Sequence, residues 1–585
     1  MSIIGIDLGT TNSLAAVWRG GRAELIPNAL GRYLTPSAVS LDETGRVLVG
    51  EAARDRLVSH PEYSAACFKR DMGTGKLYRL GGQPFTPEEL SALVLRQLRQ
   101  DAEAYLGQSV TEAVVSVPAY FNEAQRSATK RAGALAGLTV ERLINEPSAA
   151  AVAAHIGDGD ADKICLVFDL GGGTLDVSLV ERFDNVVSVT AVSGDNRLGG
   201  RDFDLAIAQG FCGETGLDFG ALSLQQQEML LRQAEDCKIA LTTQKSVLMV
   251  FAGEDGVRSV ALTNDWLIRK GTALFQRMTA PVRKVLLDSG TPLNALDELV
   301  LVGGSSRMPA VRQYIAQALG KTPYGGPTAA SSGQGPDGHS GTAPDTAVAL
   351  GAGICAGMKA RSPDLRELVL TDVCPFTLGI NVHNHANPGQ PRMSPIIERN
   401  SILPTSKVQT YCTVRDNQTT LEINVYQGEN FYCKDNVQLG ALKLHVPAAP
   451  AGEQTIDVRF TYDLNGILEV DVLSNGGQSA HLLLKNQGLS QEEIQRRVQE
   501  LAALKRHPRD QEANLALIAR GERLYAVTVG DMREQVGNML GWFQQQLASQ
   551  EPVRIAKARR QADAFLDQVE AYTGQVDLPE GWEAL

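Results

Sequence analysis

One plan is used twice in this chain, by IIGIDLGTTNS at residues 3–13 and by LVFDLGGGTLD at residues 166–176. Each stretch is an apolar run that ends in Asp-Leu-Gly, followed by a turn of small residues with a Thr and by a second strand-like run. The two acids, Asp7 and Asp169, are separated by about the length of one α/β lobe. A hairpin repeated at that distance predicts a duplicated pair of lobes with a cleft between them.

The turns of these hairpins carry the residue types that a nucleotide site needs. Hydrolysis of a nucleoside triphosphate requires backbone close to the phosphate oxygens, hydroxyls that orient them, and carboxylates that hold a metal ion. Gly-rich turns with hydroxyls occur in both hairpins and again at Gly303-Gly304-Ser305, after another apolar run. The glycine spacing matches neither a Walker-type P-loop nor the dinucleotide fingerprint. One such turn alone would predict an ordinary hairpin, but three together predict a nucleotide site.

The composition of the chain changes after the third turn. Residues 324–342 are rich in Gly, Ser and Pro, which predicts a surface loop, and helical sequence resumes at residues 345–359. The apolar run Leu368-Val369-Leu370 lies between acids and is either a buried strand or a linker that docks.

The last part of the chain contains two further sequence patterns. Residues 373–484 alternate apolar and polar residues in short runs, with turns such as Asn465-Gly466, and this pattern predicts a β domain. Ser490 and Glu493 then form a capping box ahead of apolar residues at helical spacing. The last hundred or so residues are therefore expected to be helical.

Composition limits the classes of protein that remain. A chain of 585 residues exceeds what one hydrophobic core supports, so several domains are expected. The formal net charge of -12 disfavours nucleic acid and anionic membranes as partners. Eight scattered cysteines without a C-x-x-C pair indicate a reducing compartment. Since the start carries no basic leader and no apolar stretch is long enough for a membrane helix, we expect a cytoplasmic protein.

Successive motifs resemble those of the seventy-kilodalton heat-shock chaperones of the DnaK type. They are IDLGTTNS near the start, VVSVPAYFNEAQRSATKRAG (114–133), INEPSAAA (144–151), FDLGGGTLDVS (168–178), LGGRDFD (198–204), LVGGSSRMP (301–309), DNQTTLEINVYQGE (416–429) and DLNGILEV (463–470). The resemblance implies duplicated α/β lobes of the actin-like ATPase type, then a β-sandwich that binds peptides and a short helical lid. It also implies ATP or ADP with Mg²⁺ as ligands and leaves K⁺ open.

The resemblance implies roles for the matched residues of the ATPase. Asp7 and Asp169 would hold hydrated Mg²⁺, and Glu146 would organise the metal-bound water. Lys69 would lie beside the transferred phosphate and stabilise the transition state, with Thr174 in the same catalytic group. Phosphate contacts would come from Gly9, Thr10, Thr11, Asn12, Gly171, Gly172, Gly199 and Gly200. Nucleoside contacts would come from Glu235, Lys238 and Thr242 on one helix and from Gly303, Gly304, Ser305 and Arg307 opposite. Asp176 fits a structural role as well as a catalytic one.

The resemblance extends to the control of the ATPase and to the binding of clients. Pro118 and Arg126 match a proline switch and its relay arginine, and Arg142 and Asn145 match positions that meet a J-domain co-chaperone. Leu368, Val369 and Leu370 match the apolar linker, so ATP would dock the linker and open the peptide site. Ile380, Tyr411, Leu421 and Ile423 match positions that enclose one apolar side chain of an extended, unfolded client.

Several departures point to a specialised member, most similar to the HscC branch. Thr371 replaces a leucine of the linker, Val414 replaces an alanine of the peptide arch, and HNHANPGQPR (383–392) replaces a shorter segment. Residues 246–263 predict a tight hairpin where the family often carries a longer projection, so little dependence on a nucleotide-exchange factor is expected. The tail also ends early, at Gly581-Trp582-Glu583-Ala584-Leu585.

Two rival classes remain at this stage. Sugar kinases and actin-like filament proteins share duplicated lobes with Asp-Gly-Thr hairpins, but neither needs a β domain of this kind. A dedicated clamp for one partner, with the ATPase as a slow regulator, is the other alternative. We expect a chaperone ATPase with a nucleotide-binding domain at 1–362, a linker at 363–372, a substrate-binding β-sandwich at 373–487 and a lid at 488–585.

Overall fold

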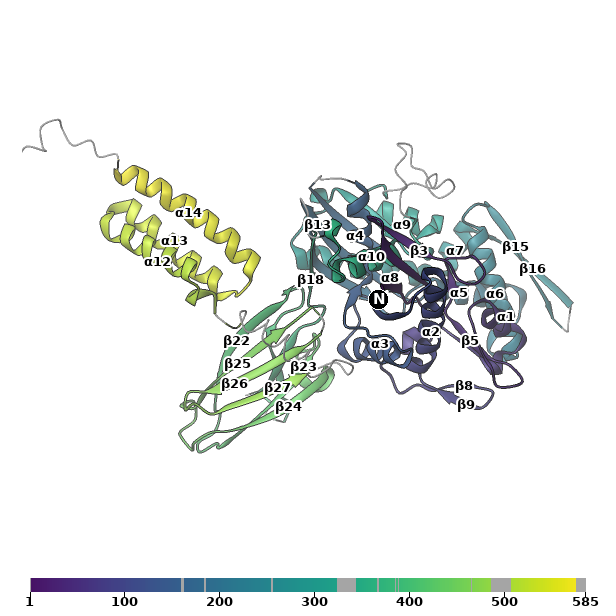
Figure 1. Cartoon of the computed structure of the whole chain (residues 1–585), viewed down its shortest axis with the longest axis horizontal. Helices are drawn as coiled ribbons and strands as arrows, with labels where there is room; N and C mark the ends of the chain where they lie inside the picture. Colours follow the sequence, from purple (N-terminus) through teal and green to yellow (C-terminus); the bar gives the residue numbers. More distant parts are fainter. Residues whose placement is uncertain are drawn as a thin grey trace, which may run out of the picture. The chain divides into compact units, whose positions relative to one another are not determined.

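The computed structural model describes residues 2–158, 162–183, 186–253, 256–323, 343–365, 368–384, 386–387, 389–464, 466–484, 505 and 507–574. The chain divides into two compact units, one built on Met1–Phe376 and the other on Thr377–Asp463, Ile467–Lys485 and Ser490–Leu585 (Figure 1). The division falls later than the predicted start of the β domain at residue 373. The reason is that the Phe376 ring packs on Tyr120 of unit 1, with ring centroids 4.5 Å apart.

The first lobe of unit 1 contains a mixed sheet in the order β11-β10-β1-β2-β3. Its elements are β1 (Ser2–Asp7), β2 (Asn12–Arg19), β3 (Arg22–Ile26), β4 (Thr35–Pro36), β5 (Ala38–Leu41), β6 (Val47–Val49), α1 (Glu51–Ser59), η1 (Pro61–Tyr63), β7 (Ser64–Ala66), η2 (Phe68–Asp71), β8 (Tyr78–Leu80), β9 (Gln83–Phe85), α2 (Pro87–Leu106), β10 (Val110–Val117), α3 (Glu123–Leu135), β11 (Leu143–Asn145) and α4 (Glu146–Asp158). The core lies between this sheet and helices α2 and α3.

The second lobe repeats the arrangement with a sheet in the order β17-β12-β13-β14-β18. Its elements are β12 (Lys163–Leu170), β13 (Leu175–Phe183), β14 (Val186–Asp195), α5 (Gly200–Thr215), η3 (Phe219–Ala221), α6 (Leu224–Ala240), β15 (Ser246–Gly253), β16 (Gly256–Thr263), α7 (Asn264–Lys270), α8 (Thr272–Ser289), η4 (Leu293–Ala295), β17 (Glu298–Val302), η5 (Gly304–Arg307), α9 (Pro309–Leu319) and β18 (Val369–Val373). The helix α10 (Ala347–Lys359), which lies between α9 and β18 in the sequence, packs instead on β1 and β2 of the first lobe and is followed by η7 (Pro363–Leu365). A separate apolar core fills this lobe.

The predicted duplication of the hairpin is confirmed by the strand pairing. β1 pairs antiparallel with β2 and parallel with β10, and β12 pairs antiparallel with β13 and parallel with β17. In both lobes the strand that ends in the acid is therefore central, with its hairpin partner on one side and a parallel strand on the other. This arrangement brings Asp7 and Asp169 to the carboxyl ends of equivalent strands, where ligands bind in α/β sheets.

Local sequence accounts for the helices that frame the first lobe. α2 begins with a capping box, in which the Thr86 side chain accepts from the Glu89 N–H and the Glu89 carboxylate accepts from the Thr86 N–H. It ends at Gly107, which has the left-handed φ of 66° common after a helix. Leu90, Val94 and Leu98 recur at helical spacing and are buried, so α2 presents one apolar face to the core.

Unit 2 begins with a β-sandwich of two four-stranded sheets, in the orders β20-β19-β23-β24 and β22-β25-β26-β27. The strands and short helix are β19 (Leu378–Val382), β20 (Arg392–Ile397), β21 (Ile402–Leu403), β22 (Thr405–Cys412), β23 (Thr420–Gln427), η8 (Cys433–Asp435), β24 (Val437–His445), β25 (Thr455–Tyr462), β26 (Leu468–Ser474) and β27 (Ser479–Leu484). Alternate residues of β23 and β25 are buried, so the alternating pattern read from the sequence is confirmed as a half-buried sheet.

The end of unit 2 is helical, as the sequence predicts. η10 (Pro508–Asp510) leads into α12 (Glu512–Val527), α13 (Gly530–Ala548) and α14 (Pro552–Gly574), which bury a common core that includes Leu524, Val536 and Phe543. The capping box at Ser490 and Glu493, the loop at 324–342, the turn residue Asn465 and the tail at 581–585 lie outside the described residues.

Candidate functional site

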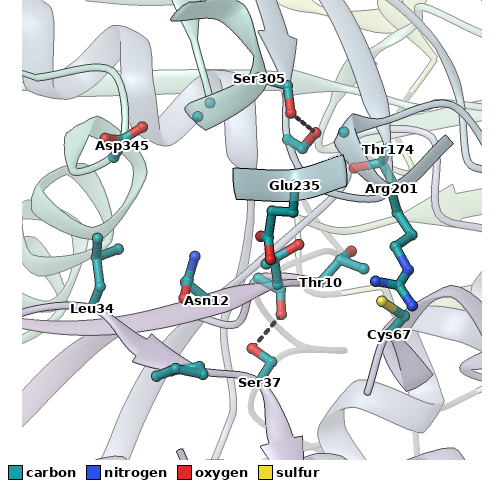
Figure 2. Close-up of a pocket in the computed structure, with 18 of the residues that line it drawn as sticks. Thr10, Asn12, Leu34, Ser37, Cys67, Thr174, Arg201, Glu235, Ser305 and Asp345 are labelled. Atoms are coloured by element: carbon teal, nitrogen blue, oxygen red, sulfur yellow. Dashed lines mark hydrogen bonds between the residues drawn. The ribbon is translucent and has the colours of Figure 1, made fainter. Parts of the chain in front are cut away.

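A cleft of about 430 Å³ in unit 1 is lined by residues of both lobes (Figure 2). The residues expected from the sequence that line it are Asp7, Gly9, Thr10, Thr11, Asn12, Lys69, Glu146, Asp169, Gly171, Gly172, Thr174, Gly200, Glu235, Lys238, Thr242, Gly303, Gly304, Ser305 and Arg307. Gly199 stands directly beside this lining, at the start of α5, where its N–H donates to the Asp202 carboxylate. Segments far apart in the chain thus converge on one concave site.

The two Gly-rich turns touch each other across this cleft. A Cβ built on Gly172 would lie 1.8 Å from Thr11 Oγ1, so only glycine permits this approach. Gly303, with a φ of +81°, likewise passes over the second hairpin, where a Cβ would meet the Asp169 carboxylate at 2.5 Å. The glycines therefore let three turns crowd around one point, with their backbone and hydroxyl groups available to an anionic ligand.

Carboxylates are concentrated at the base of the cleft. Burial raises the pKa of Asp7 to about 6, helped by the charge of Glu146 and opposed by Lys69 and by a hydrogen bond from Ser116 Oγ. Burial and the neighbouring acids also hold the pKa of Asp169 well above its ordinary value. Asp176, which pairs with Asp169 across β12 and β13, has a pKa raised to about 7, first by burial and then by Glu146.

One buried lysine lies among these acids. Lys69 is 4% exposed, and its Nζ lies 2.6 Å from Glu146 Oε1 and 5.9 Å from the centre of the Phe121 ring. η2 carries Lys69, and Glu146 is the first residue of α4, so two separate elements hold the pair. The buried ammonium of Lys69 contacts Glu146, and its charge also acts on Asp7 and Asp169. It is a suitable group to stabilise negative charge that develops on a ligand in the cleft.

Side chains of η5 and α6 supply further polar groups to the lining of the cleft. Ser305 Oγ donates to the Gly171 carbonyl at 2.9 Å, and Lys238 Nζ donates to the Gly200 carbonyl at 3.0 Å. Arg307 pairs with Asp345 at 2.6 Å, yet Nε of the arginine and Oδ1 of the aspartate are buried without a hydrogen-bond partner. Buried polar atoms without partners are costly, so these two are candidates to meet polar groups of a ligand. Thr242, expected on the same helix as Glu235 and Lys238, lies instead in the turn that follows α6, where its Oγ1 donates to the Ile239 carbonyl.

Sequence reasoning missed several charged residues of this site. Arg54 of α1 pairs with Glu235 of α6 at 2.9 Å. Arg70 donates to the Gly173 carbonyl at 2.8 Å and pairs with Asp202, which ties the first lobe to the second. Arg201 and Asp345 also line the cleft. Arg70 could have been suspected as the neighbour of Lys69, and Arg201 as part of the motif LGGRDFD, but no local pattern marks Arg54 or Asp345.

The expected switch residues form a hydrogen-bonded chain that reaches the linker. Pro118 is buried after β10, and Arg126 on α3 donates to Asn145 Oδ1 at 2.5 Å. Asn145 Nδ2 in turn donates to Asp372 at 2.8 Å. Arg142 lies close enough to Cys355 to affect its thiol: burial raises the pKa of Cys355 to about 11, and the positive charge of Arg142 opposes this rise.

The apolar run at residues 368–370 proves to be largely a strand, so one of the two alternatives left by the sequence is observed. β18 pairs parallel with β14, and Leu370 is buried while Val369 is 48% exposed. Thr371, which replaces a leucine, donates from Oγ1 to Ser188 Oγ at 2.9 Å. Thr371 therefore makes a polar contact at the position where the family resemblance leads one to expect a leucine. Arg366 and Glu367 of the predicted linker lie outside the described residues.

The residues expected to meet a peptide lie in the sandwich of unit 2. Ile380, Leu421 and Ile423 are buried within the sheet of β19 and β23. Tyr411 belongs to the other sheet, and its OH lies 3.2 Å from Ser394 Oγ of β20, so it bridges the two sheets. Val414 is 43% exposed. His385 and Pro388 of the altered segment 383–392 lie outside the described residues.

Three further expectations can be compared with the structure. The hairpin at residues 246–263 is confirmed, because β15 and β16 pair from Ser246 with Thr263 to Gly253 with Gly256. All eight cysteines are free thiols. Among the described residues, no helix combines the length and the apolar character that crossing a bilayer requires.

One known protein family matches most of the chain. The family model described as Hsp70 protein matches residues 3–78 and 75–576, which together span nearly all of both units.

Proposed function

The chain belongs to the Hsp70 family, whose members are ATP-dependent chaperones, and on this premise we propose that it is a specialised chaperone with a restricted set of clients. Members of this family hydrolyse ATP and bind polypeptide clients, and the same general activity is therefore assigned to this chain. We further propose that it belongs to the HscC branch of the family, that it acts in the cytoplasm and that a J-domain co-chaperone is one of its partners.

The observation that carries the proposal for the ATPase is the Lys69–Glu146 pair. It is almost fully buried, with 4% and 10% of the two side chains exposed, and it lies in a cleft with Asp7 and Asp169. A buried ion pair is weak evidence for stability, because desolvation of both charges offsets their attraction. Its position beside two further acids is more readily explained by chemistry.

The donor set fits Mg²⁺, which Hsp70 proteins bind together with ATP or ADP. Asp7, Asp169 and Asp176 all have raised pKa values, and Lys69 is the lysine whose charge opposes each of these rises. Lys69 also pairs with Glu146. Mg²⁺ prefers carboxylate oxygens and retained waters. Asp7 and Asp169 would hold it, with Glu146 acting through water, and it would neutralise charge on the phosphates. K⁺ is retained as a second candidate ion.

The chain's own residues would then act as follows. Gly9, Thr10 and Thr11 of the first turn and Gly171, Gly172 and Thr174 of the second bind and orient the phosphates, and Asn12 and Gly199–Gly200 complete this cradle. Lys69 stabilises the charge that develops on the transferred phosphoryl group and helps to position the attacking water. Glu146, which accepts from Lys69, fixes where that ammonium points. Glu235, Lys238, Thr242, Gly304, Ser305 and Arg307 hold the nucleoside.

We assign the control of the ATPase to the chain of contacts from Arg126 through Asn145 to Asp372. These contacts connect the segment after Pro118 with the strand that carries Leu370. A J-domain co-chaperone would act at Arg142, and Asn145, which is 4% exposed, would respond through its hydrogen bonds to Arg126 and Asp372. Ile380, Tyr411, Leu421 and Ile423 would enclose an apolar side chain of the client, and the exposed Val414 supports a narrower range of clients.

The test is fluorescence anisotropy of a labelled, extended apolar peptide on the purified full chain, with ATP added afterwards. We expect the peptide to bind without nucleotide and to dissociate on ATP addition, and we expect the same release in the Lys69→Ala variant, because release precedes hydrolysis. The altered peptide arch, in which Val414 replaces an alanine, favours one alternative function, namely a clamp dedicated to a single partner. Hydrolysis of ATP without any change in peptide affinity would support that alternative and contradict the coupled chaperone.

A further inference from the structure

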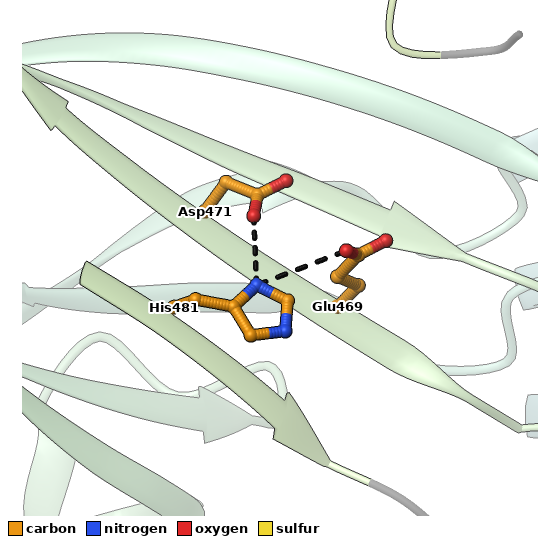
Figure 3. Close-up of side chains that lie close together, drawn as sticks. All are labelled: Glu469, Asp471 and His481. Atoms are coloured by element: carbon orange, nitrogen blue, oxygen red, sulfur yellow. Dashed lines mark hydrogen bonds and ion pairs between the residues drawn. The ribbon is translucent and has the colours of Figure 1, made fainter. Parts of the chain in front are cut away.

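Three ligand-type side chains meet on the sandwich of unit 2, outside the nucleotide cleft. Glu469 and Asp471 lie two positions apart on β26, so their side chains share one face of the sheet. His481 of β27 is the direct cross-strand partner of Asp471. Figure 3 shows the imidazole turned so that one nitrogen faces both carboxylates.

The three donor atoms are close enough to bind one ion. His481 Nδ1 lies 2.8 Å from Asp471 Oδ1 and 3.7 Å from Glu469 Oε1, and all three atoms lie within 4.8 Å of one another. Ligands bound tetrahedrally to Zn²⁺ at about 2.1 Å are separated by roughly 3.4 Å, a value between these two distances. Small side-chain adjustments would therefore produce a coordination geometry.

A cation already occupies this group. Lys505 Nζ lies 2.7 Å from Glu469 Oε1 and 2.7 Å from Asp471 Oδ2. Its ammonium marks the point at which the two carboxylates and the imidazole attract positive charge. Burial pushes the pKa of Asp471 up, but hydrogen bonds from Lys505 and His481 outweigh burial, so its pKa lies below the ordinary value and it stays ionised.

The lysine does not satisfy the whole cluster. The Glu469 side chain is only 2% exposed, and its Oε2 is buried without a hydrogen-bond partner. A buried carboxylate oxygen without a partner costs free energy, which a second bond from this carboxylate to an ion would recover. His481 is half exposed, so an ion could reach the group from solvent.

We propose that Glu469, Asp471 and His481 form a binding site for a divalent transition-metal cation of the Zn²⁺ type, for which Lys505 competes. Imidazole together with carboxylates suits Zn²⁺ and its neighbours, whereas Mg²⁺ prefers oxygen ligands alone and releases its waters reluctantly. Binding would displace the Lys505 ammonium, which stands a few residues before η10 and the helical bundle.

The experiment is a calorimetric titration of Zn²⁺ into the full chain, with excess Mg²⁺ present to occupy the acids of the nucleotide cleft. Absorption of bound Co²⁺ serves as a second readout. We expect one site, and we expect His481→Ala to weaken it by at least about tenfold, as loss of a metal ligand should. His445→Ala is the matched control, since His445 lies on β24 and contacts Thr420. This control should leave the affinity unchanged.

Lys505→Ala separates a metal site from a simple group of ion pairs. Removing the competing ammonium should strengthen Zn²⁺ binding by about threefold or more, because the carboxylates then face the metal alone. Absence of a Zn²⁺ site in both the natural chain and Lys505→Ala would overturn the proposal. A site that survives His481→Ala, or Co²⁺ spectra with thiolate charge-transfer bands that reveal a cysteine ligand such as the exposed Cys412, would overturn it too.

Discussion

Lys69 is the residue whose position is hardest to explain by stability alone. Its ammonium is buried against Glu146 and faces a cleft lined by three turns. Replacing Lys69 with alanine should lower kcat for ATP hydrolysis by about 10²–10³-fold, because one preorganised charge on the developing anion is lost. ADP affinity should change little, and both quantities can be measured by single-turnover hydrolysis and by nucleotide titration.

Lys76→Ala is the matched control for this prediction. Lys76 belongs to the same segment but is 52% exposed and pairs with Asp71 outside the cleft. Its removal should leave kcat within about twofold, since exposed ion pairs contribute little. A kcat for Lys69→Ala as close to the natural value as that of the control would contradict the role assigned to Lys69.

Asp176 predicts a dependence of stability on pH. Its pKa rises from 3.8 to about 7 on folding, so between these values the folded chain binds more protons than the unfolded chain. The free energy of unfolding should therefore fall as pH rises through this window in the absence of nucleotide and metal. Asp176→Asn should reduce that slope and raise the Tm near pH 8, and the exposed Asp236→Asn should do neither. Thermal melts between pH 5 and 8 check this, and an unchanged slope would contradict it.

The sequence identified residues of this site only where a local motif surrounds them. Lys69, Glu146 and Asp169 each stand inside a short recognisable run. Arg54 does not, because its significance depends on Glu235, a partner far along the chain that only the folded lobes bring to 2.9 Å. The raised pKa of Asp176 likewise depends on which acids surround it, and spacing along the chain does not report that.

At the scale of elements, α1 and α6 are joined at the cleft by the Arg54–Glu235 ion pair. With 22% and 16% of the side chains exposed, the pair is partly shielded from solvent. Arg54→Ala should speed ADP release by about threefold to tenfold, in line with about 1 kcal/mol for such a pair. Stopped-flow displacement of a fluorescent ADP measures it. Arg32→Ala is the control, because it removes an ion pair with Glu51 at the start of α1, and it should not change the rate of ADP release. If Arg32→Ala and Arg54→Ala accelerated ADP release equally, the cause would be a general loosening of the lobe and not the Arg54–Glu235 pair.

The strand β18 gives a prediction about the linker. Asp372 accepts hydrogen bonds from Asn145 at 2.8 Å and from Ser148 at 3.1 Å in a partly buried position. Asp372→Ala leaves these donors without their partner, so β18 should detach from β14 more readily. We expect ATP to release a bound peptide much less effectively, while basal ATP affinity is kept. Asp265→Ala, at an exposed position in the first turn of α7, is the control. Normal peptide release by Asp372→Ala would contradict a role for this contact.

The elements themselves were largely predictable, and the reasons are local. The period of two in β23 and the paired hairpins follow from residues that are neighbours in sequence. β18 was ambiguous, because three apolar residues carry no period that separates a strand from a linker. The Thr371–Ser188 hydrogen bond could not be foreseen, since it depends on the register in which β18 pairs with β14.

At the scale of the whole molecule, the division into two compact units predicts two separate responses to ligands. The nucleotide cleft is built only from residues of unit 1, and the sandwich and helical bundle of unit 2 have their own apolar cores. A ligand stabilises only the unit that binds it, by RT ln(1 + [L]/Kd), which is about 2.7 kcal/mol at a hundred times Kd. Calorimetry of the full chain should therefore show two transitions. ADP with Mg²⁺ should raise the Tm of one by several degrees, and an extended apolar peptide should raise the other. A chain with Asp169→Ala should lose the first shift and keep the second. If ADP moved both transitions equally, or if one cooperative transition were observed, the two units would not unfold independently and this prediction would be wrong.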